Sequence, residues 1–461
     1  MKAVKVLFII LISNYFLIAQ QSLDWTPLFN NQNLENWEIK NGTAPYKIEG
    51  EEIVGISKMK TPNSFLCTKK MYGDFILELE VKVDSLLNSG IQIRSQSIPS
   101  YHEGTVHGYQ VEIDPSPRAY TGGIYDESRR GWLYPLSRNE PGRKAFRQNQ
   151  WNHLRIEAIG NDIRVWLNGV NTANIVDDLT SEGFIGLQVH SIWKPELKDK
   201  EVRWRNINII TTNLQQHRKE INHTVPEENF VANTLTKSEK QEGWRLLWDG
   251  KSSENWRSIK GDAFPKTGWN INEETLTVMP SEGMESIIPG GDIISKEKFQ
   301  SFELKVEFKI AKGANSGIKY FIDPELNEEI GKSIGLEYQI LDDQNHPDAK
   351  KGIKGNRTLA SLYDLIPAEN LSRPGHSIGF TGIGKWNQAR IVVTDNRIEH
   401  WLNGYKTISY DRTEQAFKAL IDHSKFADKN NFNQIKTGHI LLQDHGNQVS
   451  FRSIKIKVLP K

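Results

Sequence analysis

The second half of this 461-residue chain repeats the motifs of the first half in the same order, and this duplication constrains the fold most. The pair Trp25 and Trp37 recurs as Trp244 and Trp256, 219 positions later. Other pairs are NSGI at 88–91 and 315–318, WLNG at 166–169 and 401–404, and GFIGLQVH at 183–190 with GHILLQDH at 438–445. The last pair is 255 positions apart, so loops of different length separate the shared segments. Each period is as long as a domain, which predicts two copies of one domain.

The local pattern within each copy is that of β-strands. Residues 75–83 (FILELEVKV) and 302–310 (FELKVEFKI) alternate apolar and polar side chains, the period of a strand. Residues 153–169 and 389–404 are typical of hairpins, because each has two such runs around an Asn-Asp or Asp-Asn turn. The best helix candidate is 414–425. Many short strands separated by turns predict an all-β antiparallel sandwich or jelly roll in each copy.

We place the first domain at 21–212 and the second at 244–461, joined by a linker. The linker, 213–243, is polar and charged with few apolar anchors, and we expect it to be partly helical. Residues 1–20 form a predicted signal peptide, because two lysines precede an apolar run that ends at Ala19. This layout predicts a secreted or periplasmic protein with no membrane span after the signal is removed.

Composition excludes several classes of partner and chemistry. Lys plus Arg total 58 and Asp plus Glu total 57, so there is no electrostatic basis for binding nucleic acid or an anionic membrane. Cys67 is the single cysteine, so no intrachain disulfide can form, and its apolar surroundings indicate a buried, inert thiol. The sequence contains no nucleophile elbow, phosphate loop, zincin helix or dinucleotide fingerprint.

Polar residues occupy one face of an otherwise apolar strand in each copy. In GLEYQIL, Glu337 and Gln339 share a face and lie about 7 Å apart at the rise of a strand. In GYQVEID, Gln110, Glu112 and Asp114 share a face, so the two copies exchange Glu and Gln. The ordinary alternative is the solvent side of a sheet.

A second strand repeats this arrangement and makes a functional face more credible. Gln443 and His445 share a face in the second copy, as Gln188 and His190 do in the first. Two such strands in each of two domains predict a polar sheet face, and on a curved sheet such a face favours a carbohydrate-binding cleft.

The loop after Gln339 is rich in groups that can move protons or bind cations. Asp342 and His346 can act as general bases or as ligands of a divalent ion, although their spacing matches no strict metal motif. Tyr363, echoed by Tyr125, can supply a phenolic proton or a stacking ring. Arg94 has the strand parity of the polar face in the first copy, so we predict a substrate contact there. Arg205 and Arg452 are predicted to be structural partners of buried carboxylates.

The ordered set of motifs resembles the 3-keto-disaccharide hydrolase domain family. The residues that carry the resemblance are FNNQNLENW and LWDGKSSENW, NSGI, GYQVEID and GLEYQILDD, GGIYD and SLYDLIP, WLNG, and LQVH and LQDHG. The resemblance covers nearly all of 25–210 and 244–458. It implies a concanavalin-like jelly roll and activity on glycosides already oxidised at C3 of the sugar.

The chemistry that this resemblance implies assigns roles to the candidate residues. A C3 ketone acidifies the C2 proton, so a base can remove it and the C1 substituent can leave by β-elimination; hydration of the enone then gives the 3-keto sugar. We expect Glu337 or His445 as the base and Asp342, His346 or Tyr363 as the acid or a ligand. Arg357 or a divalent metal ion would stabilise the enolate. The first copy offers Glu112, Asp114, Tyr125 and His190.

The remaining predicted substrate contacts are amides. They are Gln339 and Gln443 in the second copy, with Gln110 and Gln188 in the first. No cofactor is required by the sequence beyond the optional divalent metal ion, whose identity stays open. Two alternatives also remain: a non-catalytic lectin-like protein, because this fold hosts many binding proteins, and an ordinary two-carboxylate glycosidase.

Overall fold

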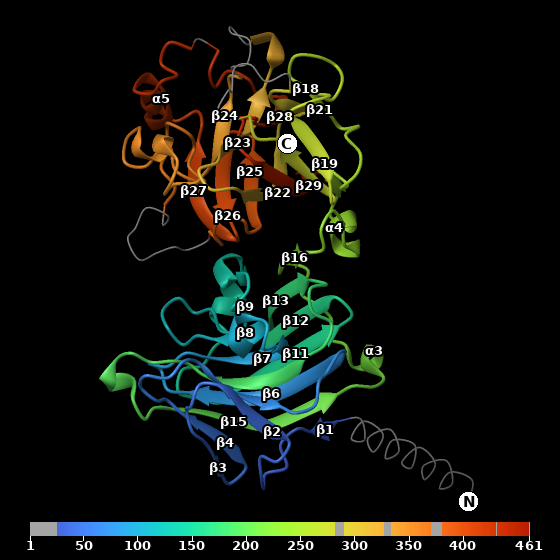
Figure 1. The fold of residues 1–461 in the computed structure, drawn as a ribbon, viewed down its shortest axis with the longest axis vertical. Coiled ribbons are helices and arrows are strands. Elements are labelled where there is room, and N and C mark those ends of the chain that lie inside the picture. The colour runs from blue at the N-terminus through green and yellow to red at the C-terminus, as the bar shows by residue number, and fades with distance from the viewer. Residues whose placement is uncertain (1–24, 282–289, 327–332, 370–379, 430, 461) are drawn as a thin grey trace, which may run out of the picture. The chain divides into compact units, whose positions relative to one another are not determined.

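The computed structural model describes residues 25–281, 290–326, 333–369, 380–429 and 431–460, so the predicted signal peptide lies outside the described residues. The chain divides into two compact units, unit 1 (residues 1–230) and unit 2 (residues 231–461). Both units consist mainly of antiparallel strands with a few short helices (Figure 1). No helix in the described part of the chain is long and apolar enough to cross a membrane.

Unit 1 contains a nine-stranded and a seven-stranded sheet. The larger has the order β16-β13-β12-β11-β6-β15-β4-β3, with β1 also paired to β15. Its strands are β1 (Thr26–Pro27), β3 (Tyr46–Glu49), β4 (Glu52–Ile56), β6 (Phe75–Val83), β11 (Asn152–Ile159), β12 (Asp162–Leu167), β13 (Val170–Val176), β15 (Glu201–Ile210) and β16 (Glu227–Asn229). The smaller has the order β10-β9-β8-β7-β14-β5-β2. Its strands are β2 (Trp37–Asn41), β5 (Ser64–Thr68), β7 (Ser89–Gln96), β8 (His107–Ile113), β9 (Ile124–Glu127), β10 (Gly131–Tyr134) and β14 (Phe184–Val189).

Unit 2 contains an eight-stranded and a five-stranded sheet. The larger has the order β19-β20-β29-β22-β25-β26-β27, with β17 paired to β29. Its strands are β17 (Trp244–Leu246), β19 (Trp269–Asn272), β20 (Thr275–Val278), β22 (Phe302–Ile310), β25 (Asn387–Thr394), β26 (Arg397–Leu402), β27 (Tyr405–Asp411) and β29 (Val449–Val458). The smaller has the order β18-β21-β28-β23-β24. Its strands are β18 (Trp256–Ser258), β21 (Ile293–Phe299), β23 (Asn315–Ile322), β24 (Leu336–Leu341) and β28 (Gly438–Leu442).

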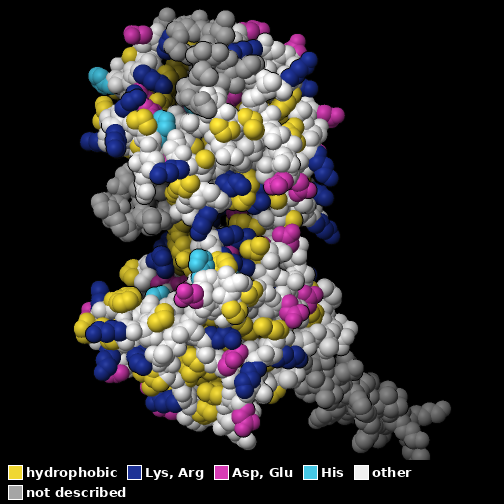
Figure 2. Space-filling view, in the orientation of Figure 1, with side chains coloured by type: hydrophobic (Ala, Val, Ile, Leu, Met, Phe, Trp, Pro, Cys, Tyr) yellow, Lys and Arg dark blue, Asp and Glu magenta, His cyan; other side chains and the backbone are white. Residues whose placement is uncertain are grey.

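The helices are short and lie in the connections. They are α2 (Glu140–Arg143), α3 (Leu214–His217), α4 (Lys237–Gln241) and α5 (Gln415–Asp422), with 3-10 turns at His102–Gly104, Leu136–Arg138, Pro195–Leu197, Pro324–Leu326 and Pro347–Lys350. The predicted helix at 414–425 is therefore confirmed as α5, and the two predicted hairpins are β11–β12 and β25–β26. On the face drawn in Figure 2, Lys and Arg side chains are interspersed with Asp and Glu, as the balanced charge predicts.

The repeated tryptophans make the same contact in both units. The indole nitrogen of Trp37 donates to the carbonyl of Leu28 at 3.2 Å, and that of Trp256 donates to Leu247 at 2.8 Å. Both rings are buried. A buried indole N–H needs a partner, so each opening segment is fixed against its sandwich by the same hydrogen bond. Cys67 is buried as predicted, and burial raises its thiol pKa.

Both units also share β-bulges that a strict alternation of faces does not predict. Asn206 and Ser453 have positive φ angles of 51° and 49°, and the pairing shifts there. Arg205 donates to Glu80 at 2.7 Å and Arg452 to Glu307 at 2.7 Å, so both arginines have a carboxylate partner, although only Glu307 is buried as expected. Each guanidinium also lies over a tryptophan ring.

The stretch predicted as a linker packs against both units. The helix α3 and the strand β16 precede residue 230, and β16 pairs in parallel with β13 of unit 1. The helix α4 belongs to unit 2, where the buried ammonium of Lys455 lies 2.9 Å from Glu239. The expected partial helicity of this stretch is confirmed.

Candidate functional site

The polar face of unit 2 lies on its smaller sheet, opposite the face that enters the core. Ile318, Tyr338 and Ile340 point into the core cluster between the sheets. Strand alternation therefore sends Lys319 and Glu337 to the other face, where they sit directly opposite each other. The Lys319 ammonium lies 3.7 Å from a Glu337 carboxylate oxygen, and both side chains are buried.

Gly317 of the NSGI motif provides the space for this carboxylate. A Cβ atom built on Gly317 would lie 2.3 Å from Oε1 of Glu337. Gly317 pairs with Gln339, and the backbone N–H of Gln443 donates to its carbonyl at 3.0 Å. Because Gly317 has no side chain, it leaves a hollow in the row of polar side chains, and the Glu337 carboxylate fills part of this hollow.

Two buried amide oxygens beside this hollow are unsatisfied. Oε1 of Gln339 and Oε1 of Gln443 have no hydrogen-bond partner among the residues that the structure describes. Gln339 uses its amide nitrogen to donate to Asn315 at 3.3 Å. An unpaired buried acceptor costs about 1–3 kcal/mol, so the two oxygens are prepared to accept hydrogen bonds from hydroxyl groups of a ligand.

Tyr363 extends the polar face beyond Glu337. Its backbone N–H donates to the carbonyl of Glu337 at 3.1 Å, and its hydroxyl donates to Asp348 at 2.8 Å. Burial and this hydrogen bond raise the pKa of Tyr363, so the phenol is protonated at neutral pH. Arg357 donates to Asp348 at 3.3 Å and to Asp364 at 2.6 Å, which holds both carboxylates in place.

Lys425 is a second cation at this position. Its ammonium lies 4.0 Å from the ring centroid of Tyr363, a cation–π distance. Burial lowers its pKa, while the nearby Glu337 carboxylate acts in the opposite direction. Lys319 and Lys425 therefore both lie near Glu337.

Asp342 and His346, predicted as acid or ligand, form hydrogen bonds within the loop that follows Gln339. Asp342 accepts hydrogen bonds from the backbone of Gly313 at 2.7 Å and from the side chain of Asn345 at 2.7 Å, and it also caps the following turn. Nδ1 of His346 accepts the backbone N–H of Asp348 at 3.2 Å. Their hydrogen bonds shape the loop that carries Asp348. His445 is half-buried, two residues after Gln443.

The equivalent strands of unit 1 carry different side chains at the positions of this polar face. Gln92 sits opposite Gln110, and Gly90 opposite Glu112, so Gln110 takes the place of Glu337. A Cβ atom on Gly90 would lie 2.3 Å from the Gln110 side chain. Glu112 accepts hydrogen bonds from Asn88 at 2.6 Å and from Gln110 at 2.9 Å. Burial raises the pKa of Glu112 to about 7.

The other predicted residues of unit 1 surround this row. Tyr125 sits opposite Gln110 on the next strand, with its ring edge-to-face on Trp132. Nδ1 of His190 lies 2.7 Å from the Ser191 carbonyl, so Nδ1 carries a proton and Nε2 is the acceptor. Asp114 forms a 2.8 Å ion pair with Arg118. This places Asp114 in an ion pair at the end of the row.

Arg94 does not contact the polar face, and the predicted substrate contact is wrong. Its side chain is 1% exposed, and its three nitrogens donate to Gly73, Gly160 and Asp74 at 2.7–2.8 Å. A positive φ of 45° at Arg94 marks a bulge that breaks the alternation. Phe321 has a φ of 60° at the equivalent point of unit 2.

Two residues of the site, Lys319 and Lys425, were not predicted from the sequence. Lys319 had a usable signal, because alternation in NSGIKY places it on the same face as the polar pair. Lys425 had none, since it lies in the long connection between β27 and β28. Among the described residues, no group of three or more His, Cys, Asp or Glu side chains is arranged to hold a metal ion. The described side chains around Glu337 therefore do not fit a metal site.

The sheets and their buried polar faces define a pair of concanavalin-like jelly-roll domains. The chain belongs to the family described as 3-keto-alpha-glucoside-1,2-lyase-like domains, whose model matches residues 24–210 and 243–457. It is similar to a 3-keto-disaccharide hydrolase of Bacteroides thetaiotaomicron, with 36% identity over 237 residues, 47% of this chain and 79% of the relative.

Solved structures similar to parts of this chain include two bacterial proteins. One is a candidate glycosyl hydrolase from Parabacteroides distasonis, with 28% identity and a TM-score of 0.44, covering 50% of this chain and all of the other. Another is a carbohydrate-binding module of Bacillus subtilis, with 20% identity and a TM-score of 0.28, covering 39% of this chain and 97% of the other.

Proposed function

We propose that this protein cleaves glycosides whose sugar is oxidised to a ketone at C3, and that unit 2 carries the active site. The observation that carries the proposal is the buried Glu337 carboxylate over Gly317, with Lys319 beside it and Lys425 nearby. Family membership and the named 3-keto-disaccharide hydrolase relative support carbohydrate cleavage. The predicted signal peptide supports a secreted or periplasmic setting.

Glu337 is the proposed base that removes the C2 proton. A carboxylate can take this proton because the neighbouring C3 ketone makes it acidic. Lys319 forms an ion pair with Glu337 and limits its movement from the opposite strand. His445 is the alternative base, because it lies two residues after Gln443, which adjoins the same hollow.

The enolate oxygen at C3 would be stabilised by the two lysines. Fixed cations in a partly desolvated site stabilise developing negative charge far better than water-exposed ones do. The amide oxygens of Gln339 and Gln443 would accept hydrogen bonds from sugar hydroxyls and so orient the ring. Arg357, which was predicted to stabilise the enolate, is instead assigned to positioning because it is bonded to Asp348 and Asp364.

Departure of the C1 substituent completes the elimination. The C2 proton passes to the base, the C1–O bond breaks, and the leaving oxygen receives a proton that we assign to Tyr363. Water then adds to the enone, so the sum of both steps is hydrolysis to the 3-keto sugar and an alcohol. A protein that catalyses only the elimination would be a lyase, and a protein that catalyses only the addition of water to the enone would be a hydratase.

The direct test uses a chromogenic 3-keto-glucoside and its unoxidised parent, each with and without chelator. We expect release of the alcohol from the keto form alone. Release from the unoxidised parent would support the two-carboxylate glycosidase, and binding of either compound without turnover would support the lectin-like alternative.

Two matched variants then assign the site. Glu337→Gln should lower kcat/KM about 100-fold or more, the usual loss on removing a general base. Glu112→Gln, the matched change in unit 1, should leave turnover within a factor of about two. If Glu337→Gln retains full activity, the assigned base is wrong and His445→Gln becomes the variant to measure.

A further inference from the structure

The polar face of unit 1 differs from that of unit 2 in its charges. Gln110 occupies the position of the Glu337 base, and Gln92 occupies that of Lys319. The connection that carries Lys425 in unit 2 runs from 412 to 437, whereas its counterpart in unit 1 is only 177–183. The unit 1 face therefore lacks counterparts of the proposed base and of both lysines.

An ordered chain of amides replaces those charges. Ser95 donates to Gln92 at 2.6 Å, Gln92 donates to Gln110 at 2.7 Å, and Gln110 donates to Glu112 at 2.9 Å. Asn88 donates to the other oxygen of Glu112 at 2.6 Å. This directional chain fixes the orientation of each amide on the face.

Gln188 contributes two unpaired, buried amide atoms to this surface. Its side chain is 0% exposed, and neither its amide nitrogen nor its amide oxygen has a hydrogen-bond partner in the described part of the chain. By the strand register it shares a face with Gly90 on the neighbouring strand, where the hollow lies. Burial of an unpaired amide costs about 1–3 kcal/mol, and a hydroxyl group can satisfy both of its atoms as donor and acceptor.

Burial shifts several titratable groups of this face toward their neutral forms. Burial raises the pKa of Glu112 to about 7 and lowers the pKa of His190 below its usual value. Asp114 and Arg118 compensate each other in their ion pair, and burial raises the pKa of Glu127. Such a face is suited to sugar hydroxyls and does not supply the charges that an enolate requires.

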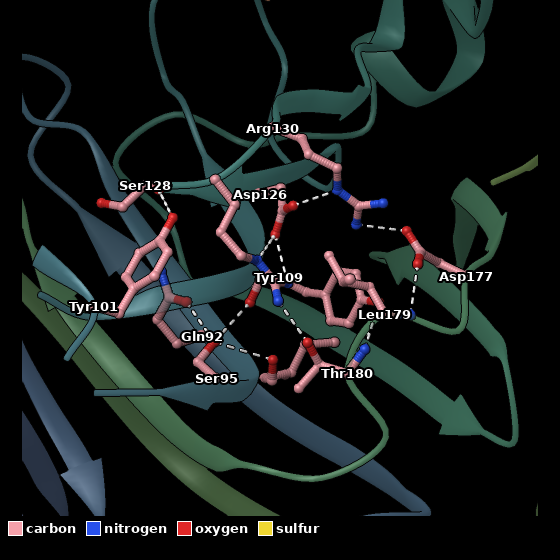
Figure 3. A network of polar contacts seen from close by, with 12 residues as sticks. Gln92, Ser95, Tyr101, Tyr109, Asp126, Ser128, Arg130, Asp177, Leu179 and Thr180 are labelled. Carbon is pink, nitrogen blue, oxygen red and sulfur yellow. Dashed lines mark hydrogen bonds and ion pairs between the residues drawn. The ribbon is translucent and has the colours of Figure 1, made fainter. Parts of the chain in front are cut away.

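The strand β9, which carries Tyr125, is held in place by a network of ion pairs around the next residue, Asp126. Asp126 accepts hydrogen bonds from Arg129 at 2.8 Å and from Arg130 at 2.6 Å, and Arg130 reaches Asp177 at 2.6 Å. Figure 3 shows Arg130 between Asp126 and Asp177, with Tyr109 close by. This network joins β9 to the loop after β13, so the face is preorganised and loses little entropy when a ligand binds.

We propose that unit 1 is a binding site for an uncharged saccharide, which it holds without cleaving, through Gln188, Asn88, His190 and Glu112. The proposal rests on the proposed function only in assigning cleavage to unit 2. It gives the two copies different ligands: intact sugar in unit 1 and 3-keto-glycoside in unit 2.

Isothermal titration of the full chain with trehalose, maltose and cellobiose tests this proposal. We expect at least one of these unoxidised disaccharides to bind. Gln188→Leu should weaken binding at least about 10-fold by removing the amide. It should not reduce stability, because an apolar side chain of similar size replaces an unpaired buried polar one. A purely structural glutamine would not combine lost binding with retained stability.

Matched variants show which unit binds the disaccharide and control for loss of folding. Asn88→Ala changes a partly exposed residue and should also weaken binding, whereas Gln443→Leu and Asn315→Ala in unit 2 should not. The proposal is overturned if none of the disaccharides binds, or if Gln443→Leu abolishes binding while Gln188→Leu retains it. Binding as expected without turnover by the parent chain would overturn the proposed function alone.

Discussion

At the scale of single residues, the two copies differ by an exchange of charged and neutral side chains on one scaffold. In unit 2 the carboxylate is Glu337, which lies opposite Lys319. In unit 1 it is Glu112, which lies opposite Gly90 and two residues beyond Gln110, the equivalent of Glu337. Lys319 lies beside the former, while only amides donate to the latter. On the same backbone, one carboxylate therefore has a lysine as its partner, while burial raises the pKa of the other.

Lys425 is expected to determine the alkaline limit of turnover. Burial lowers its pKa, so its positive charge is lost at a lower pH than that of an exposed lysine. The enolate loses one cation as the pH rises through this value, and kcat should then fall. Lys425→Arg should move the loss of activity to higher pH, while Lys425→Met should lower kcat about 10-fold or more at the pH values where the parent lysine is charged. A pH–rate profile that is identical in all three proteins would contradict this role.

Glu112 is expected to make the stability of unit 1 depend on pH. Its folded pKa of about 7 lies above the ordinary value of 4.5, so the folded state binds more protons between these limits. Stability should therefore fall as the pH rises from about 4.5 to 7, by up to about 3 kcal/mol. Glu112→Gln removes this term. Denaturant unfolding of both proteins at pH 5 and pH 8 should show the variant gaining stability relative to the parent at the higher pH; equal differences at both values would refute the assignment.

At the scale of strands and loops, the sequence predicted what depends on alternation and failed where alternation is interrupted. The faces of Glu337 and Gln339 followed from period 2, as did the hairpins. The prediction for Arg94 failed because a bulge with positive φ reverses the face of the strand on which its side chain lies. No residue type in SGIQIR indicates such a bulge. Lys425 was missed because long-range packing, not local pattern, brings a residue from the α5 connection over Tyr363.

Gly317, the glycine of NSGI in β23, should be essential for activity but not for formation of the strand. Gly317→Ala places a Cβ atom 2.3 Å from the Glu337 carboxylate, which must move, so kcat/KM should fall about 10-fold or more. Gly261→Ala is the control, because its Cβ would meet nothing within 4 Å. Circular dichroism should show both variants folded. Full activity of Gly317→Ala would show that the position of Glu337 is not critical.

At the scale of the whole molecule, each unit is completed by part of the stretch between the two family matches. The strand β16 extends the larger sheet of unit 1. In unit 2, Asn233 exchanges hydrogen bonds of 3.0 and 2.8 Å with Ser453 and so satisfies the backbone N–H at the β29 bulge. The structural boundary thus falls at residue 230, whereas the repeated motifs begin only at Trp244.

The segment 231–243 should therefore be required for a stable unit 2. Lys455 is 2% exposed, and its partner Glu239 belongs to α4, whose N-terminus is closed by a capping box with Thr236. A fragment that starts at residue 244 leaves the Lys455 ammonium buried without this carboxylate. It should be about 3–5 kcal/mol less stable than a fragment that starts at residue 231. Urea unfolding of the two fragments measures the difference. Lys455→Met should restore part of the loss in the shorter fragment and not stabilise the longer one, because only the shorter fragment contains the uncompensated charge. Equal unfolding midpoints for the two fragments would show that α4 is an external linker.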